Sequence, residues 1–333
     1  MSVSRTVAMG AAEAVQGYTT WAAPFGRALV EEATRRPEIV GLSADLARYT
    51  DMLPFAESFP GRFINVGMAE QNLVCVAAGL ARSGFVPVAT TYAVFATRRA
   101  FDFIAIQCAS SRVNVKIVAG LPGLTTGYGA THQGIDDLAH MRVLPNMVVL
   151  DPCDAVDMAN ATKAALDYDG PVYMRLLRGE VPVVLDPGSS RFEIGKANLL
   201  REGDGVGIIA SGIMVQRALE ASNVLATLGV AAAVLKVSTL KPFDAQAVRA
   251  LAAATGALVT AENHSVIGGL FSATADCLAR SIVAVPIEAV GIQDEFGTCG
   301  SLSYLADRHQ LSTTHVVTAA QLAVANKQSR GTR

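Results

Sequence analysis

The sequence predicts an α/β protein of two domains, each a largely parallel sheet flanked by helices. Short apolar stretches of strand length alternate with longer stretches of helical periodicity along the chain, a pattern typical of strand–helix–strand units. The chain has 333 residues, which is enough for two domains of ordinary size. A turn-rich stretch interrupts the alternation near its middle, so we expect the second domain to begin there.

The first domain opens with a helix over residues 24–36, where Phe25, Ala28 and Leu29 repeat at helical spacing and Pro24 occupies the first turn. Strands and helices then alternate as far as residue 177. We predict strands within 38–45 and over 63–66, 85–91, 113–120, 147–150 and 172–177, with helices over 68–82, 94–110, from 136 onward and over 154–166.

The stretch 184–193 (VLDPGSSRFE) contains paired turn formers and is predicted to be the linker between the domains. We therefore assign residues 1–19 to an N-terminal extension, 20–187 to the first domain and 188–333 to the second. Four further strands are expected in the second domain, over 206–212, 230–237, 257–263 and 285–292, with helical segments between them.

The composition excludes several classes of protein. Hydrophobic residues make up 51% and charged residues 17%, which favours extensive burial over disorder. No apolar run approaches the roughly 18 residues of a membrane-spanning helix, so we expect no membrane insertion. The net charge is −2 and no basic stretch is interleaved with aromatic residues, which argues against nucleic-acid binding.

The N-terminal residues and the cysteines indicate a cytoplasmic protein. Glu13 interrupts the only candidate apolar core of a signal peptide, so cytoplasmic localisation is expected. The five cysteines are scattered without a C-x-x-C pair, which fits reduced thiols better than disulfides or zinc ligands. We expect no metal site in this chain.

The segment 67–72 (GMAEQN) places Glu70 where a strand turns into a helix that is otherwise apolar. An acidic residue in a first helical turn is commonly a partner of the helix dipole. The apolar helix after it indicates instead that the Glu70 carboxyl is buried, and burial favours its protonated form.

The segments FINVGMAEQN (63–72) and GLSADL (41–46) resemble those of transketolases and the related 1-deoxy-D-xylulose-5-phosphate synthases. The resemblance extends over roughly 24–322 and implies a pyrimidine-binding domain followed by a transketolase C-terminal domain. It also implies that Glu70 faces the aminopyrimidine of thiamine diphosphate. A protonated carboxyl there would hydrogen-bond a ring nitrogen and promote the imino tautomer that acts as the base.

The segment 90–102 (TTYAVFATRRAFD) carries aromatic side chains at a strand end and on the next helix. An ordinary core seam would have this pattern too. In the resembling family the segment packs aromatic rings against the aminopyrimidine, which implies this role for Tyr92 and Phe95.

The stretch 120–134 (GLPGLTTGYGATHQG) contains five glycines and no apolar period, so it is predicted to be a functional loop. A loop histidine is often a surface or structural residue. The THQG segment resembles the active-site loop of the family, which implies that His132 contacts the hydroxyls of donor and acceptor sugars. The glycines would let the backbone approach a ligand closely.

Arg178, in YMRLLRG (173–179), follows a buried strand. It could be an ordinary surface arginine. The resemblance implies instead that it holds the acceptor phosphate by a forked, charge-assisted contact, with help from Arg99 or Arg98. In the second domain STLKP, TAENHSVIGG and GIQDEFGTCG also resemble the family, and we expect a mainly architectural role there, including for His264.

Two features limit the identification of the substrate. Tyr128 stands where full-length transketolases carry an acidic residue before the THQ turn. The arginine and histidine with which those enzymes hold the acceptor phosphate have no clear equivalents near 21–23 or Gly120.

The predicted function is that of one subunit of a split transketolase that transfers a two-carbon ketol unit from a ketose to an aldose. No segment resembles the domain that binds the diphosphate and Mg²⁺, so we expect an N-terminal partner subunit to supply it, in an α2β2 heterotetramer or with a dimer formed through this chain. A 1-deoxyxylulose-phosphate-synthase-like subunit and a 2-oxo acid dehydrogenase β subunit are alternatives, although THQG, RLLRG and STLKP argue against the latter. A non-catalytic scaffold is a third, disfavoured by the presence of Glu70, Tyr92 and His132 together.

Overall fold

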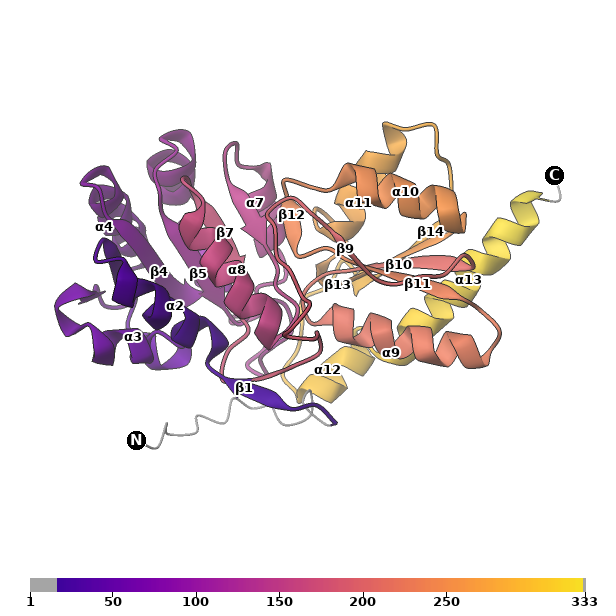
Figure 1. Ribbon diagram of the computed structural model, residues 1–333, viewed down its shortest axis with the longest axis horizontal. Coiled ribbons are helices and arrows are strands. Elements are labelled where there is room, and N and C mark those ends of the chain that lie inside the picture. Colours follow the sequence, from indigo (N-terminus) through magenta and orange to yellow (C-terminus); the bar gives the residue numbers. More distant parts are fainter. Residues whose placement is uncertain (1–16, 332–333) are drawn as a thin grey trace.

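The computed structural model describes residues 17–331 and shows two α/β domains side by side (Figure 1). The α/β fold class and the two-domain organisation predicted from the sequence are confirmed. Of the predicted N-terminal extension, residues 1–16 lie outside the described part of the chain.

The first domain contains a seven-stranded sheet with the order β12-β6-β7-β5-β4-β2-β3. Six strands are parallel, and β12 joins them antiparallel to β6. The strands β2, β4 and β5 are buried along their whole length, because helices cover both faces of the sheet. The strand bounds are β2 Ile39–Ser43, β3 Phe63–Asn65, β4 Val86–Tyr92, β5 Lys116–Gly120, β6 Val148–Leu150, β7 Val172–Arg175 and β12 Thr239–Lys241.

Two apolar layers pack on this sheet. Phe25, Ile39 and Val88 belong to the layer beneath α2 and α8, and Leu42 and Leu73 belong to the layer beneath α4, α5 and α7. The helix bounds are α2 Pro24–Arg35, α3 Leu53–Ser58, α4 Glu70–Arg82, α5 Ala93–Arg99, α6 Phe101–Phe103, α7 Asp137–Val143 and α8 Ala155–Asp167.

The helix predicted over 94–110 is divided in the structure. It consists of α5, α6 and a π-helical stretch over Ile104–Ser110. Ala96, Ala100, Ile104 and Cys108 are all buried at intervals of four residues. An α-helix of 3.6 residues per turn would rotate such a series away from the core, so local underwinding keeps it facing inward.

The second domain contains a five-stranded sheet with the order β14-β13-β10-β11-β9, in which β9 is antiparallel to β11. Its strands are β9 Asn198–Arg201, β10 Val206–Ala210, β11 Ala232–Lys236, β13 Leu258–Ser265 and β14 Ile287–Ile292. Its helices are α9 Met214–Thr227, α10 Ala245–Thr255, α11 Leu270–Ala279, α12 Leu302–Arg308 and α13 Thr313–Gly331. Among the described residues, no helix is both long enough and apolar enough to span a membrane.

Four short strands were not predicted, namely β1 (Thr20–Ala22), β8 (Glu180–Pro182), β9 and β12. β1 and β8 pair only with each other, and β9 and β12 are edge strands. Each forms because a distant segment supplies its partner, which local sequence does not reveal. β12 also carries the second half of the chain back to the first sheet, so both domains contribute to one apolar core.

Candidate active site

The residues singled out in the first domain gather at the carboxyl edge of its parallel sheet. Tyr92 ends β4, the loop 120–134 follows β5, and Arg178 lies three residues after β7. In parallel α/β sheets this edge is where ligands usually bind. The strand order places β4, β5 and β7 next to one another, so the three segments come together there.

Glu70 is the first residue of α4, and only 3% of its surface is exposed. Its Oε1 atom accepts a hydrogen bond from Nη1 of Arg99 at 3.2 Å. The side chains of Leu73 and Val74 on the next turn are buried, which draws the start of the helix against the sheet. The predicted burial of Glu70 is therefore present, and its partner is an arginine that the sequence had assigned to substrate binding.

Aromatic rings surround His132. Its ring centre lies 5.4 Å from Phe95, 6.2 Å from Tyr92 and 5.4 Å from Tyr128, each in an edge-on arrangement. Tyr92 and Phe95 are themselves in contact, with centres 5.8 Å apart. The guanidinium of Arg99 lies 4.0 Å above the Phe95 ring, so a continuous series of contacts joins Glu70 to His132.

Arg178 lies near enough to Tyr92 for its charge to act on the Tyr92 hydroxyl. Burial raises the pKa of the Tyr92 hydroxyl, and the positive charge of Arg178 partly opposes this shift. Among residues 17–331, Arg178 forms no ion pair within 4.0 Å. Arg98, by contrast, pairs with Asp136 at 2.9 Å and faces Phe296 of the second domain.

Asp51 supports the turn that carries Arg178, and sequence reasoning missed it. Its Oδ2 atom accepts a hydrogen bond from the Gly179 backbone N–H at 3.0 Å. Burial raises the pKa of Asp51 to about 6, against the opposing effects of the Gly179 N–H and the Arg178 charge. Only its place shortly after GLSADL could have drawn attention to it.

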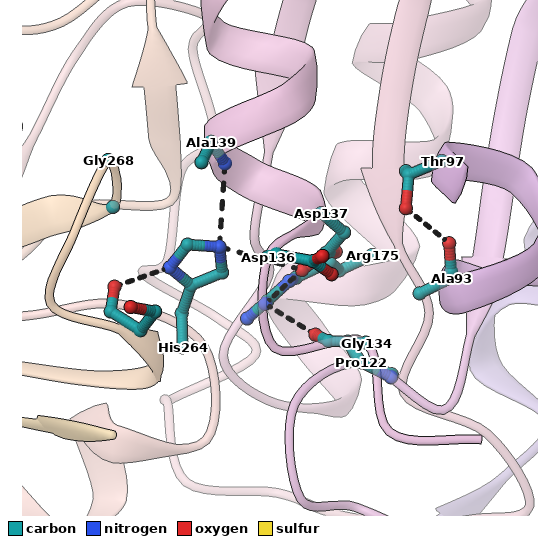
Figure 2. Close-up of polar contacts among 12 residues, drawn as sticks. Ala93, Thr97, Pro122, Gly134, Asp136, Asp137, Ala139, Arg175, His264 and Gly268 are labelled. Atoms are coloured by element: carbon teal, nitrogen blue, oxygen red, sulfur yellow. Dashed lines mark hydrogen bonds and ion pairs between the residues drawn. The ribbon is translucent and has the colours of Figure 1, made fainter. Parts of the chain in front are cut away.

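A buried ionic network between the domains was also missed (Figure 2). Arg175 donates from Nη2 to Asp137 Oδ1 at 2.5 Å and from Nε to Asp137 Oδ2 at 2.8 Å. It also contacts Asp151 at 3.4 Å and the carbonyl oxygen of Asn263 at 3.2 Å. Burial alone would raise the pKa of Asp137, but Arg175 reverses the effect and holds it below its usual value.

His264 lies at the same junction. Its Nε2 atom accepts a hydrogen bond from the Ala139 N–H at 3.4 Å, and Nδ1 lies 2.6 Å from the Ser265 carbonyl oxygen (Figure 2). Burial and the nearby charge of Arg175 lower the pKa of His264 to about 4. The imidazole is thus neutral near pH 7 and joins the domains rather than facing the aromatic cluster.

A cavity of about 380 Å³ lies between the two domains, and Arg178 is among the residues that line it. Leu121, Leu176 and Leu177 of the first domain line it together with Arg217 and Leu311 of the second. Glu70 and His132 do not line this cavity. Among the described residues, no group of three or more His, Cys, Asp or Glu side chains is arranged to hold a metal ion.

Comparison with protein families matches both domains. Residues 18–183 match the model of the transketolase pyrimidine-binding domain, and residues 195–316 match that of the transketolase C-terminal domain. A putative uncharacterised transketolase family protein of Sinorhizobium fredii is 50% identical over 314 residues, which cover 94% of this chain and 91% of that protein.

Two further relatives have informative names. The 6-deoxy-6-sulfo-D-fructose transketolase subunit of Clostridium sp. (strain MSTE9) is 44% identical over 91% of this chain and 94% of its own length. A solved structure described as a split gene transketolase, inactive β4 tetramer, is 46% identical with a TM-score of 0.85 and covers 92% of this chain and 98% of its own.

Proposed function

This chain belongs to the transketolase family, and we propose that it is the pyrimidine-binding subunit of a split, thiamine-diphosphate-dependent transketolase. The observation that carries the proposal is the buried Glu70 carboxyl, joined through Arg99 to the cluster of Tyr92, Phe95 and His132.

The residues at this edge fit the pyrimidine half of the cofactor. A flat ring with a polar edge needs an apolar slot and a group that hydrogen-bonds a ring nitrogen. Tyr92 and Phe95 would provide the slot, and Glu70 would bond the nitrogen where little water enters. When bound, thiamine diphosphate supplies the carbon nucleophile on which a two-carbon ketol unit is carried.

His132 and Arg178 are proposed to bind the sugars. His132 lies beside the slot, where Nε2 can bond a substrate hydroxyl while Nδ1 lies 2.9 Å from the Thr131 hydroxyl. Arg178 has a forked guanidinium suited to the tetrahedral anion at the end of a substrate. Both phosphate and sulfonate have this geometry, and the second is named in the relative that acts on 6-deoxy-6-sulfo-D-fructose.

We propose that a second polypeptide binds the diphosphate and Mg²⁺. The proposal is supported by the names of two relatives, one a transketolase subunit and one a split gene transketolase whose β4 tetramer is inactive. An α2β2 heterotetramer would bring a partner domain against Glu70 and the aromatic cluster.

Reconstitution tests this function. The chain alone should transfer no ketol unit, whereas the chain with its partner, thiamine diphosphate and Mg²⁺ should.

In the reconstituted enzyme Glu70→Ala should lower kcat by about 10²-fold to 10⁴-fold, the range of a lost acid–base contribution. Glu193→Ala changes an exposed carboxylate of the linker and is the matched control. A wild-type rate in Glu70→Ala would contradict the catalytic role assigned to Glu70. If the reconstituted enzyme instead oxidises a 2-oxo acid with lipoamide as acceptor, the chain is a 2-oxo acid dehydrogenase subunit and not a transketolase subunit.

A further inference from the structure

The second domain holds the loop that carries His132 at two places. Near its start, Asn263 Oδ1 accepts a hydrogen bond from the Leu124 N–H at 3.0 Å, and Asn263 Nδ2 donates to the Pro122 carbonyl at 3.4 Å. Near its end, the loop meets the second domain's segment 297–300. We call residues 120–134 the site loop and residues 297–300 the contact segment.

Gln133 makes the central bonds between them. This side chain, next to His132, is only 1% exposed. Its Nε2 atom donates to the carbonyl oxygen of Thr126, within the site loop, and to that of Thr298, in the contact segment, at 3.0 Å each. One amide therefore closes the site loop upon itself and attaches it to the other domain.

The backbones of the two segments also touch. Tyr128 and Cys299 form an antiparallel bridge, and the Gly300 N–H donates to the Gly127 carbonyl at 3.4 Å. A methyl group at Gly297 would overlap Oε1 of Gln133 and lie 2.7 Å from Cδ2 of Leu124. The contact segment can approach Gln133 this closely because position 297 has no side chain.

We propose that Gln133 is a positioning residue: its buried amide, held by the contact segment, fixes the His132 ring against Tyr92, Phe95 and Tyr128. The second domain thereby acts on the site although none of its side chains belongs to the aromatic cluster. The effect of Gln133 on catalysis rests on the proposed function, whereas its effect on the position of the His132 ring is independent of that function.

Two variants change this contact from opposite sides. Gln133→Leu keeps a similar volume and removes both donated hydrogen bonds. Gly297→Ala keeps the amide and forces the contact segment or Gln133 to move. Thr255→Val is the control, because it also removes a buried side-chain donor: the Thr255 hydroxyl lies 2.8 Å from the Leu251 carbonyl oxygen and 3.0 Å from that of Ala257, at the end of α10 away from the site loop.

Hydrogen exchange of the full chain gives the first measurement. Within the site loop the amides of Gly123, His132 and Gly134 are hydrogen-bonded to loop carbonyls, so their protection can be followed. In Gln133→Leu and Gly297→Ala, exchange over 121–134 should accelerate about tenfold or more, while the core strands keep wild-type protection. Thr255→Val should leave the site loop unchanged.

The NMR signal of the His132 imidazole ring gives the second measurement. The chain has five histidines, and the ¹³C-labelled imidazole of His132 can be assigned by its loss in His132→Asn. In the two contact variants this signal should shift or broaden as the ring leaves its aromatic neighbours, and the other four should not.

Kinetics of the enzyme reconstituted with its partner give the third. At a temperature where all variants are folded, kcat/KM should fall about tenfold to 100-fold in both contact variants, the effect of a misplaced binding group, and should not change in Thr255→Val. Unchanged exchange of the site loop would overturn the proposal. Faster exchange of the site loop together with an unchanged His132 signal would also overturn it. The Gln133 side chain would then stabilise the loop without positioning the His132 ring. If the wild-type enzyme transfers no ketol unit, the proposed function fails, and exchange and the His132 signal still decide the positioning role.

Discussion

Arg99 contacts both Glu70 and Phe95, two residues that the sequence analysis identified in separate segments as candidate site residues. Its guanidinium is 4.0 Å from the Phe95 ring centre and donates to Glu70 at 3.2 Å. A cation over a ring that also bonds a buried carboxylate orders both partners. At the scale of single residues, Arg99 therefore joins α5 to the start of α4, whereas its predicted contact with substrate stays a prediction.

Arg178 provides a test of substrate binding. Arg178→Ala should raise the KM for the anionic acceptor by about tenfold to 100-fold with little change in kcat, as expected when binding is lost equally from substrate and transition state. Arg178→Lys should restore only part of the affinity, because an ammonium cannot form the forked contact. Steady-state kinetics with phosphorylated and sulfonated acceptors measure this. An equal loss with a neutral acceptor would show that Arg178 does not bind the anion.

Asp51 provides a test by pH. Burial in the folded protein raises the pKa of its carboxyl from the ordinary value of 3.8 to about 6. Between these values the folded state binds more protons, so the free energy of unfolding should fall as pH rises from 4 to 6, by up to about 3 kcal/mol. Asp51→Asn should lack this loss.

Urea unfolding at pH 4, 5, 6 and 7 measures the free energy of unfolding of Asp51→Asn and of the wild type. The value for Asp51→Asn minus the value for the wild type should increase with pH. Asp307→Asn, at an exposed position of α12, is the control and should follow the wild-type profile. Parallel profiles for Asp51→Asn and the wild type would show that Asp51 is not responsible.

At the scale of elements, one buried side chain connects helix α8 with the start of the interdomain linker. Asp154 caps α8 by accepting from the Asp157 N–H at 2.7 Å. Its second oxygen accepts from the N–H groups of Val184 and Leu185 at 2.8 and 2.7 Å. The linker is thus held against the first domain although half of its residues are turn formers.

Asp154→Ala should destabilise the protein by about 2–4 kcal/mol, because it removes a helix cap and leaves buried linker N–H groups without an acceptor. Ser301→Ala removes the cap of α12, whose hydroxyl accepts from the Tyr304 N–H and also lies 3.0 Å from the exposed Ser303 hydroxyl, and should cost about 1 kcal/mol. Denaturant unfolding measures both. Equal losses would mean that the linker bonds contribute nothing.

At the scale of the whole molecule, the Arg175 network joins the domains. Arg175→Met should cost about 3–5 kcal/mol, since Asp137 and Asp151 would be left buried without their cation. Arg175→Met combined with Asp137→Leu should recover part of the loss, because it removes one of the stranded charges. Denaturant unfolding followed by Trp21 fluorescence and circular dichroism measures this, and a double variant no more stable than Arg175→Met alone would contradict it.

The sequence determined the features that depend on neighbours along the chain. Apolar periodicity marked most strands and helices of both domains, and a carboxyl before the apolar helix 71–82 indicated the burial of Glu70. The glycine-rich stretch before His132 likewise identified a loop at the site. These patterns are local, so they could be recognised without knowing what lies opposite them.

Only the tertiary structure decided which distant residues meet. Gln133 bonds Thr298, 165 positions away, and Arg175 bonds the Asn263 carbonyl, 88 positions away. β12 pairs with β6 across the domain boundary, and the half-exposed Arg99 side chain donates to the buried Glu70 carboxylate. A hydrogen bond or ion pair needs both partners within a few ångströms of each other. Residues that are distant along the chain show no sequence periodicity from which such a pairing could be predicted.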